Sequence, residues 1–197
     1  MTSVATVGTR ERLIATARTY LDEEGVDGIG LREIARRAGL SHGAPLRHFP
    51  TLAALLAAVA ADGFRDLYAS VDAATRDISD PIARVRASAH GYVDFARTHP
   101  GPFSLMFRSD LCDTSDPEYA TTGGIAFGQL VGLVVEAQAV GFHAEVLAAE
   151  LAGVLWAHMH GLAILHLHGA LVPTTGQTDL DVLVDLSNSL LFPDPRK

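Results

Sequence analysis

The chain has 197 residues, 48% of them hydrophobic and 19% charged, which is enough apolar material for a packed core and excludes a disordered chain. Its one cysteine, Cys112, excludes an internal disulfide framework and fits a reducing cytoplasm. The net charge of −8 argues against nucleic acid as a partner, but the charge is uneven. Residues 1–50 carry seven arginines and six acidic residues, a net charge of +1, whereas residues 51–197 carry a net charge of −9.

The segment Leu151–Val172 contains no Asp, Glu, Lys or Arg and is long enough to span a bilayer. It also contains four histidines that point to at least two faces of a helix, and no cluster of basic residues flanks it. We therefore expect a helix buried inside a soluble helical body and no membrane partner. The first residues lack the pattern of a signal peptide, which also favours a cytoplasmic protein.

The first fifty residues predict three helices. An apolar stripe runs through residues 10–24, and Gly25 and Gly28 end it. A second stripe runs through residues 31–38 and ends at Gly39. Ser41 is a favourable N-cap for a short third helix that reaches Arg47 or His48.

The rest of the chain is predicted to be helical too. Thr51 caps a long helix that ends near residue 76, and Asp80-Pro81 opens a helix that ends near His99. Pro100 and Pro102 predict a turn before a short helix over 103–107, and residues 109–116 predict a loop. Further helices are expected over 118–140, 144–170 and 179–192, with a loop around Pro173 and Gly176. The fold class is all-α, divided into residues 1–50, a connecting helix over 51–76, and a larger helical domain over 77–197.

Residues 31–49 have the size and pattern of a helix-turn-helix: a helix, a tight glycine turn and a second helix. Ile34 and Ala35 face the core, and Gly39 makes the turn. The second helix presents small or polar groups that can approach base edges in a major groove.

The same stretch resembles the TetR family of repressors, through Ile34-Ala35, Ala38 to Gly43, His48 to Pro50 and Leu55-Leu56. A second stretch, Trp156-Ala-His-Met-His-Gly-Leu162, resembles a Trp…His-Gly motif in the C-terminal domains of some TetR-like regulators. The resemblance implies a three-helix DNA-binding domain followed by a ligand-binding and dimerisation domain. It also implies a repressor that a small apolar effector releases from a near-palindromic operator.

The predicted DNA contacts combine the exposed groups of the second helix with the arginines of residues 31–49 and the start of the long helix. In the family, the position of His48 touches phosphate. The chain departs from the family at Gly30, where a Thr or Ser is usual, at Pro45, at Leu46 for a Tyr, and at Leu52 for a Lys. The predicted set is Arg32, Arg36, Arg37, Ser41, His42, Gly43, Ala44, Leu46, Arg47, His48 and Thr51.

Trp156 and His160 are four residues apart and share one helix face. Such a pair is compatible with an ordinary core or with the wall of an effector cavity. For the cavity, the predicted lining consists of aromatic and methionine residues of the helical body: Tyr92, Phe95, Phe103, Met106, Phe107, Phe127, Trp156, Met159 and His160. The histidine spacing matches no zinc motif, and no catalytic constellation stands out, so we expect no metal, no cofactor and no enzyme activity.

The last predicted helix is apolar on two sides, through Leu180, Val184 and Leu191 on one and Leu183, Leu186 and Leu190 on the other. It therefore needs two partners, and we expect a homodimer through residues 144–170 and 179–192. The alternative is a helical ligand-binding protein or small enzyme that has lost DNA binding, which the missing family groups favour.

Overall fold

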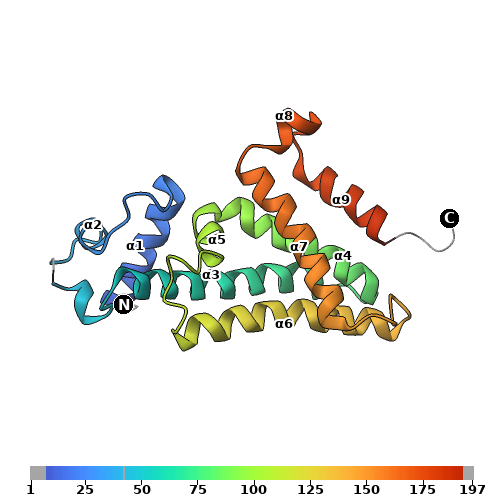
Figure 1. Ribbon diagram of the computed structural model, residues 1–197, viewed down its shortest axis with the longest axis horizontal. Helices are drawn as coiled ribbons and strands as arrows, with labels where there is room; N and C mark the ends of the chain where they lie inside the picture. Colours follow the sequence, from blue (N-terminus) through green and yellow to red (C-terminus); the bar gives the residue numbers. More distant parts are fainter. Residues whose placement is uncertain (1–7, 42, 193–197) are drawn as a thin grey trace, which may run out of the picture. The chain divides into compact units, whose positions relative to one another are not determined.

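The computed structural model describes residues 8–41 and 43–192, and within these ranges every regular element is helical (Figure 1). The chain divides into two compact units: residues 1–64 with 99–123, and residues 65–98 with 124–197. The boundary falls inside two long helices, α3 (Leu52–Thr75) and α6 (Pro117–Ala139), so that each of these helices supplies residues to both units. The all-α prediction is confirmed.

The first unit is built on α1 (Thr9–Glu24), α2 (Leu31–Arg37), the short 3-10 helix η1 (Pro45–Arg47) and α5 (Pro100–Met106). α1 buries its predicted stripe and packs against both α2 and α5. The α5 contact is close because Gly101 lies directly on the α1 backbone. A Cβ at Gly101 would stand 2.3 Å from the carbonyl carbon of Leu21, and the amide of Gly101 donates to the Asp22 carboxylate at 2.9 Å.

The second unit is built on α4 (Pro81–Thr98), α7 (Ala148–Leu167), α8 (Leu171–Thr175) and α9 (Leu180–Leu191). α4 packs against α7 and α9, which also contact each other. Ser70 donates a hydrogen bond to the carbonyl of Gly91 at 2.8 Å, and Gln129 donates to the carbonyl of Tyr68 at 3.1 Å. These bonds join the second-unit parts of α3, α4 and α6.

Most helix ends follow the predicted signals. The hydroxyl of Thr51 accepts from the amide of Ala54 at 3.1 Å, and Asp80 accepts from the amides of Ile82 and Ala83 at 2.8 and 3.0 Å. α9 (Leu180–Leu191) is capped by Asp179, whose carboxylate accepts from the amide of Asp181.

Three boundaries differ from the predictions for local reasons. α5 starts at Pro100 instead of after Pro102, because proline fits the first turn of a helix, where no intrahelical amide donor is needed. α7 starts at Ala148 instead of residue 144, since the chain turns at Gly141 and His143, both with positive φ. The predicted loop at Pro173 contains α8, and Gly176 in the left-handed region ends it.

The expectation that α7 is buried inside a helical body is wrong in this structure. α6 and α7 are long and apolar enough to cross a membrane by length and composition, yet only 28% and 22% of their most apolar windows are buried. α7 buries one face, through Ala152, Leu155, Met159 and Ala163. The other faces of α7 therefore remain available for further contacts.

Candidate functional site

The turn after α2 is set by Gly39. Its φ of +65° lies in the left-handed region, its amide donates to the carbonyl of Arg36, and the amide of Leu40 donates to the carbonyl of Ala35. These two bonds satisfy the last carbonyls of α2 in the pattern of a Schellman motif. Arg12 of α1 also donates to the carbonyl of Ala38. The helix-turn-helix pattern thus has a defined turn that α1 supports.

The predicted third helix is only a short 3-10 turn over Pro45–Arg47, so the prediction of a helix from Ser41 onward is wrong in its extent. Pro45 has no amide hydrogen to donate to the carbonyl of residue 41, so the first hydrogen bond of an α-helix capped by Ser41 cannot form. The amide of Ala44 instead makes a turn with the carbonyl of Ser41 at 3.0 Å. The recognition segment therefore presents a turn followed by one tight helical turn.

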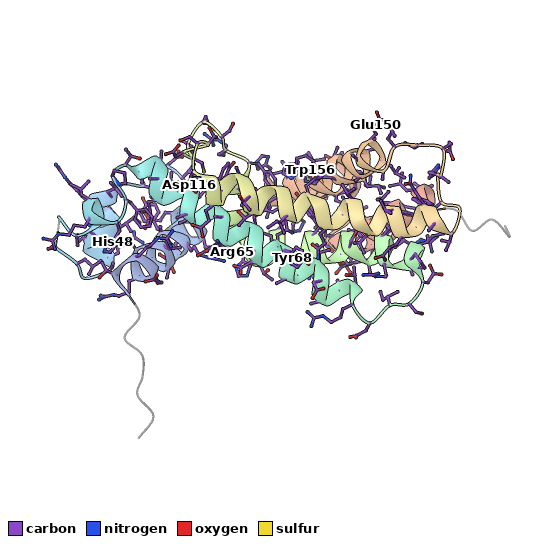
Figure 2. All side chains as sticks on the ribbon, turned by 90° about the horizontal axis from the view of Figure 1, so that it is seen from below. His48, Arg65, Tyr68, Asp116, Glu150 and Trp156 are labelled. Atoms are coloured by element: carbon purple, nitrogen blue, oxygen red, sulfur yellow. The ribbon has the colours of Figure 1, made fainter. Side chains whose placement is uncertain are left out.

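This segment leaves most of its predicted contact residues accessible. Ser41, Gly43, Leu46, Arg47 and His48 are exposed and Ala44 is half-buried, whereas Pro45 is buried; Figure 2 labels His48. Leu46 is 60% exposed, so its side chain is accessible to a partner. His42 lies outside the described residues.

Arg36 and Arg37, two of the predicted contacts, are held by acidic groups of α1 and α2. Both pair with Glu33, at 2.6 and 2.9 Å, and Arg37 also pairs with Glu23 and Glu24. The hydrogen bonds from Arg36 and Arg37 lower the pKa of Glu33 to about 2. The Arg37 guanidinium lies 4.5 Å from the centre of the Tyr20 ring. These contacts make Arg37 a bridge between α1 and α2.

Arg32 and Arg47 differ from that pair. Both are exposed, and among the residues that the structure describes neither has a carboxylate within ion-pair distance. They are consequently the cations of residues 31–49 that a phosphate or base can approach without breaking an existing ion pair. Thr51 is exposed, and its hydroxyl serves as the α3 cap.

The second unit brings Tyr92 of α4 together with Trp156 and His160 of α7. The Trp156 indole donates to the Tyr92 hydroxyl at 3.1 Å, and that hydroxyl lies 2.8 Å from Nδ1 of His160. Phe127 of α6 meets Trp156 edge to face, with ring centres 5.8 Å apart. Burial raises the pKa of Tyr92 and lowers that of His160, so that both groups are neutral near pH 7.

Trp156 and His160 line an open groove of about 650 Å³ in the second unit. We call it the Trp156 groove; Figure 2 labels Trp156 on α7. The wall consists of Phe127, Gly153, Trp156, Ala157, His160, Gly161, Ile164 and Leu165. Sequence reasoning found the three ring-bearing residues but missed the small and aliphatic ones, although Gly153, Ala157 and Gly161 recur every four residues on one side of α7.

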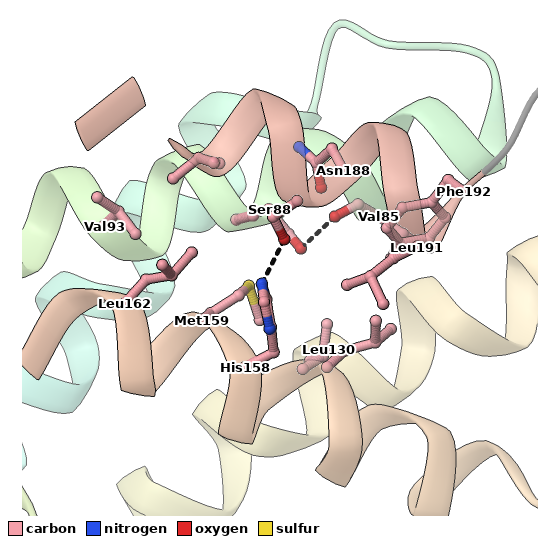
Figure 3. A pocket seen from close by; sticks show the side chains of 14 residues that line it. Val85, Ser88, Val93, Leu130, His158, Met159, Leu162, Asn188, Leu191 and Phe192 are labelled. Carbon is pink, nitrogen blue, oxygen red and sulfur yellow. Dashed lines mark hydrogen bonds between the residues drawn. The ribbon is translucent and has the colours of Figure 1, made fainter. Parts of the chain in front are cut away.

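The other predicted lining residues lie elsewhere. Phe103, Met106 and Phe107 belong to the first unit, where Phe103 and Phe107 meet with ring centres 5.4 Å apart. Phe95 and Met159 are buried in the second unit. Met159 lines a cavity among α4, α7 and α9 that measures only about 10 Å³ (Figure 3). A cavity of that size holds at most about one water molecule, so it is not a ligand site as it stands.

No group of three or more metal-binding side chains occurs in the described part of the chain. His158 hydrogen-bonds Ser187 of α9 (Figure 3), and His90 of α4 pairs with Asp181 and Asp185 of α9. Cys112 is buried, and burial raises its pKa to about 11, which disfavours the reactive thiolate. These histidines therefore join helices, and the buried thiol is held in its protonated form near pH 7.

Exposed apolar side chains lie on both α7 and α9. On α7, Val154 and Leu165 are 64% and 46% exposed and lie eleven residues apart, about three helical turns. On α9, Leu186 and Leu190 are 54% and 72% exposed. The opposite stripe of α9, with Leu180 and Val184, is buried in the unit. We call the exposed residues Val154, Leu165, Leu186 and Leu190 the outer strip.

Comparison with known proteins gives two family matches. Residues 13–59 match the family described as bacterial regulatory proteins, tetR family. Residues 85–187, more than half of the chain, match the family described as tetracyclin repressor-like, C-terminal domain. The first range includes the helix-turn-helix, and the second includes Tyr92 and the Trp156 groove.

Individual proteins also resemble this chain in sequence or in fold. The HTH-type transcriptional activator FasR of Mycolicibacterium smegmatis is 30% identical over 114 residues, 58% of this chain and 51% of FasR. The chain thus spans about half the length of the curated relatives it matches. A Rhodococcus sp. RHA1 protein of unknown function is 32% identical over 97% of each chain, with a TM-score of 0.83. AibR, solved with isovaleryl coenzyme A and operator DNA, shares the fold at 16% identity, with 94% of this chain and 99% of AibR covered and a TM-score of 0.66.

Proposed function

Because the chain belongs to the TetR family of transcriptional regulators, we propose that it is a cytoplasmic repressor that binds a near-palindromic operator as a homodimer. A small apolar effector bound in the second unit releases it from the DNA. The protein acts by binding rather than by catalysis. The observation that carries the proposal is the segment after α2, where the Gly39 turn precedes a short helix with exposed Arg47 and His48.

We assign the DNA-binding surface to the exposed groups of this segment together with Arg32 and Thr51. Arg32 and Arg47 supply charge to phosphates or base edges, and Ser41 and His48 supply hydrogen bonds. We assign Arg36 and Arg37 to their ion pairs with Glu33 and not to DNA. Moving either arginine onto DNA would take a partner from the Glu33 carboxylate and leave that charge near the phosphates. We therefore assign Arg32 and Arg47 to DNA, Arg36 to an ion pair within α2, and Arg37 to the contact between α1 and α2.

Homodimerisation is supported by the outer strip. A two-fold axis would place the α7 and α9 of one protomer against those of the other and bury the four side chains. Effector release requires a ligand that prefers the conformation that does not bind DNA. α3 and α6 contribute residues to both units, so they are the elements on which such a preference can act.

The test is binding to the DNA that precedes the protein's own gene, measured by fluorescence anisotropy against a duplex of random sequence at several salt concentrations. Arg32→Ala and Arg47→Ala should each weaken binding. Loss of a base contact costs about 1–3 kcal/mol in the specific complex, and loss of a phosphate contact lowers the salt slope by about 1. Arg36→Ala is the matched control and should leave the slope unchanged.

A second candidate function follows from the recognition segment itself. η1 is one turn long, and Pro45 is buried in it. Leu46 and Leu52 stand where the family usually has a Tyr and a Lys. These features favour a helical ligand-binding protein or small enzyme without DNA binding. Absence of salt-dependent binding to both duplexes would favour this second function and refute the first.

A further inference from the structure

We propose that the Trp156 groove binds an uncharged, ring-bearing molecule with one hydrogen-bond acceptor, which His160 recognises. This inference rests on the proposed function in that the bound molecule is the effector. It adds the chemical class of that molecule and a residue that reads its polar group.

The hydrogen bonds that link Trp156, Tyr92 and His160 indicate which polar group a ligand needs. An indole N–H can only donate, so the Tyr92 oxygen accepts from Trp156. The Tyr92 hydroxyl hydrogen is then placed to satisfy Nδ1 of His160, 2.8 Å away. An imidazole that accepts at Nδ1 carries its hydrogen on Nε2. In this assignment His160, a residue of the groove wall, carries an N–H donor at Nε2, for which a ligand carbonyl can compete.

The residues of the groove wall indicate that the bound part of the ligand is uncharged. Within the described residues, no lysine or arginine lines the groove, and its one titratable group is a histidine that burial keeps neutral. A carboxylate or phosphate placed there would lose hydration without gaining a cation, which is strongly unfavourable. The groove therefore selects against ligands whose charged group must lie within it, such as a compact aromatic carboxylate.

The shape favours a ring. Phe127 and Trp156 meet at 63°, so that their edges and faces form a corner into which a third ring can pack edge to face. A Cβ at Gly153 would meet no atom within 4 Å, so this side of α7 is open. The groove volume of about 650 Å³ lies within the range of about 300–1,000 Å³ typical of small-molecule sites.

A second copy of the chain is the competing occupant, because the two surfaces meet on α7. Consecutive helix residues are about 100° apart, so Trp156 of the groove lies about 160° from Val154 of the outer strip, whereas Gly161 lies about 20° from Val154. Leu165 belongs to both surfaces. Protomers that pair through the strip would therefore border the groove, and the experiment must distinguish a ligand from a second copy.

The experiment uses three ligands of nearly equal shape: 1-acetylnaphthalene, 1-ethylnaphthalene and 1-naphthoate. Calorimetry gives their affinities for the intact protein, and fluorescence reports the groove, since Trp156 is the single tryptophan of the chain. The ketone should bind about five- to tenfold more tightly than the hydrocarbon, the gain of one hydrogen bond. The carboxylate should bind at least about tenfold more weakly than the ketone.

The variants locate the site. His160→Phe should reduce the preference for ketone over hydrocarbon to less than about twofold while retaining hydrocarbon binding. Tyr92→Phe should lower the same preference, because it removes the group that positions His160; a merely structural role would weaken all ligands alike. Gly153→Leu should fill the groove and abolish binding. Gly128→Leu, at an exposed α6 glycine outside the wall whose added Cβ also meets no atom, is the matched control.

Tighter binding of naphthoate or of decanoyl-coenzyme A would overturn the assignment, as would a ketone preference that survives in His160→Phe. A Trp156 emission shift that follows the monomer–dimer transition without ligand would show that a second copy covers the groove, and would overturn it too. These results do not depend on DNA. Failure of ligand binding with intact operator binding refutes the groove, and ligand binding without operator binding refutes the proposed repressor.

Discussion

The outer strip predicts that Leu190→Asp makes the protein monomeric. Leu190 is 72% exposed in the protomer, and burying a leucine side chain is worth about 2 kcal/mol. A two-fold interface contains each residue twice, so that the substitution removes about 4 kcal/mol of burial before any cost of the two buried carboxylates is added. The dimer dissociation constant should therefore rise by about a thousandfold or more.

Sedimentation equilibrium over a range of protein concentrations measures this constant directly. Ser189→Asp is the control, because it adds the same charge at an exposed α9 position one residue away without removing apolar surface. Leu191 is a poorer probe, because it lines the small cavity inside the second unit and its replacement would damage the core of the protomer. If Leu190→Asp sediments as the wild type does, the interface lies elsewhere. A wild-type protein that is monomeric at micromolar concentration would refute the reasoning outright.

Three further predictions test packing and pH. Gly101→Ala should lower the free energy of unfolding by about 3 kcal/mol, because the new Cβ would lie 2.3 Å from the α1 backbone. Gly128→Ala should raise the free energy of unfolding by up to about 1 kcal/mol, because its Cβ would meet no atom within 4 Å. Thermal unfolding measures both changes. Thr51→Ala should cost about 1 kcal/mol and Thr51→Ser much less, since the hydroxyl caps α3, and denaturant unfolding distinguishes them. Burial lowers the pKa of His160 below its ordinary 6.5, so the stability it contributes should be constant above pH 6.5 and lost as the pH falls below that value. The ring resonance of His160 followed by NMR should accordingly titrate below 6.5, and a midpoint at or above 6.5 would contradict the buried arrangement.

The features that the sequence predicted well depend on a few neighbouring residues. Thr51 and Asp80 cap their helices as expected because an N-cap bond joins residues only two or three positions apart. Gly39 turns the chain because its conformation is one that other residues rarely adopt. Local chemistry of this kind is complete in a short stretch of sequence, and it located the candidate DNA-binding surface.

The recognition segment shows how one residue can override a pattern. Ser41 and the small residues after it predict a helix, but Pro45 lacks the amide that the first turn of that helix would use. The sequence contained this information, and greater weight on the proline would have predicted the short 3-10 turn. The pairing of Arg37 with Glu23 and Glu24 could not be foreseen in the same way, because it depends on how α1 and α2 pack.

α7 marks the limit of periodicity as a guide to burial. Its sequence is apolar nearly all round, and such a helix is ordinarily predicted to lie in a core. In the structure one face, with Leu155 and Met159, packs into the unit, a second carries Gly153 and Trp156 of the groove, and a third carries Val154 and Leu165. A helix can be apolar on every side when each side has a different partner: for α7, its own unit and, as we propose, a ligand and a second protomer. Hydropathy does not distinguish these partners, and only the packing of α4, α6 and α9 around α7 shows which side is already buried.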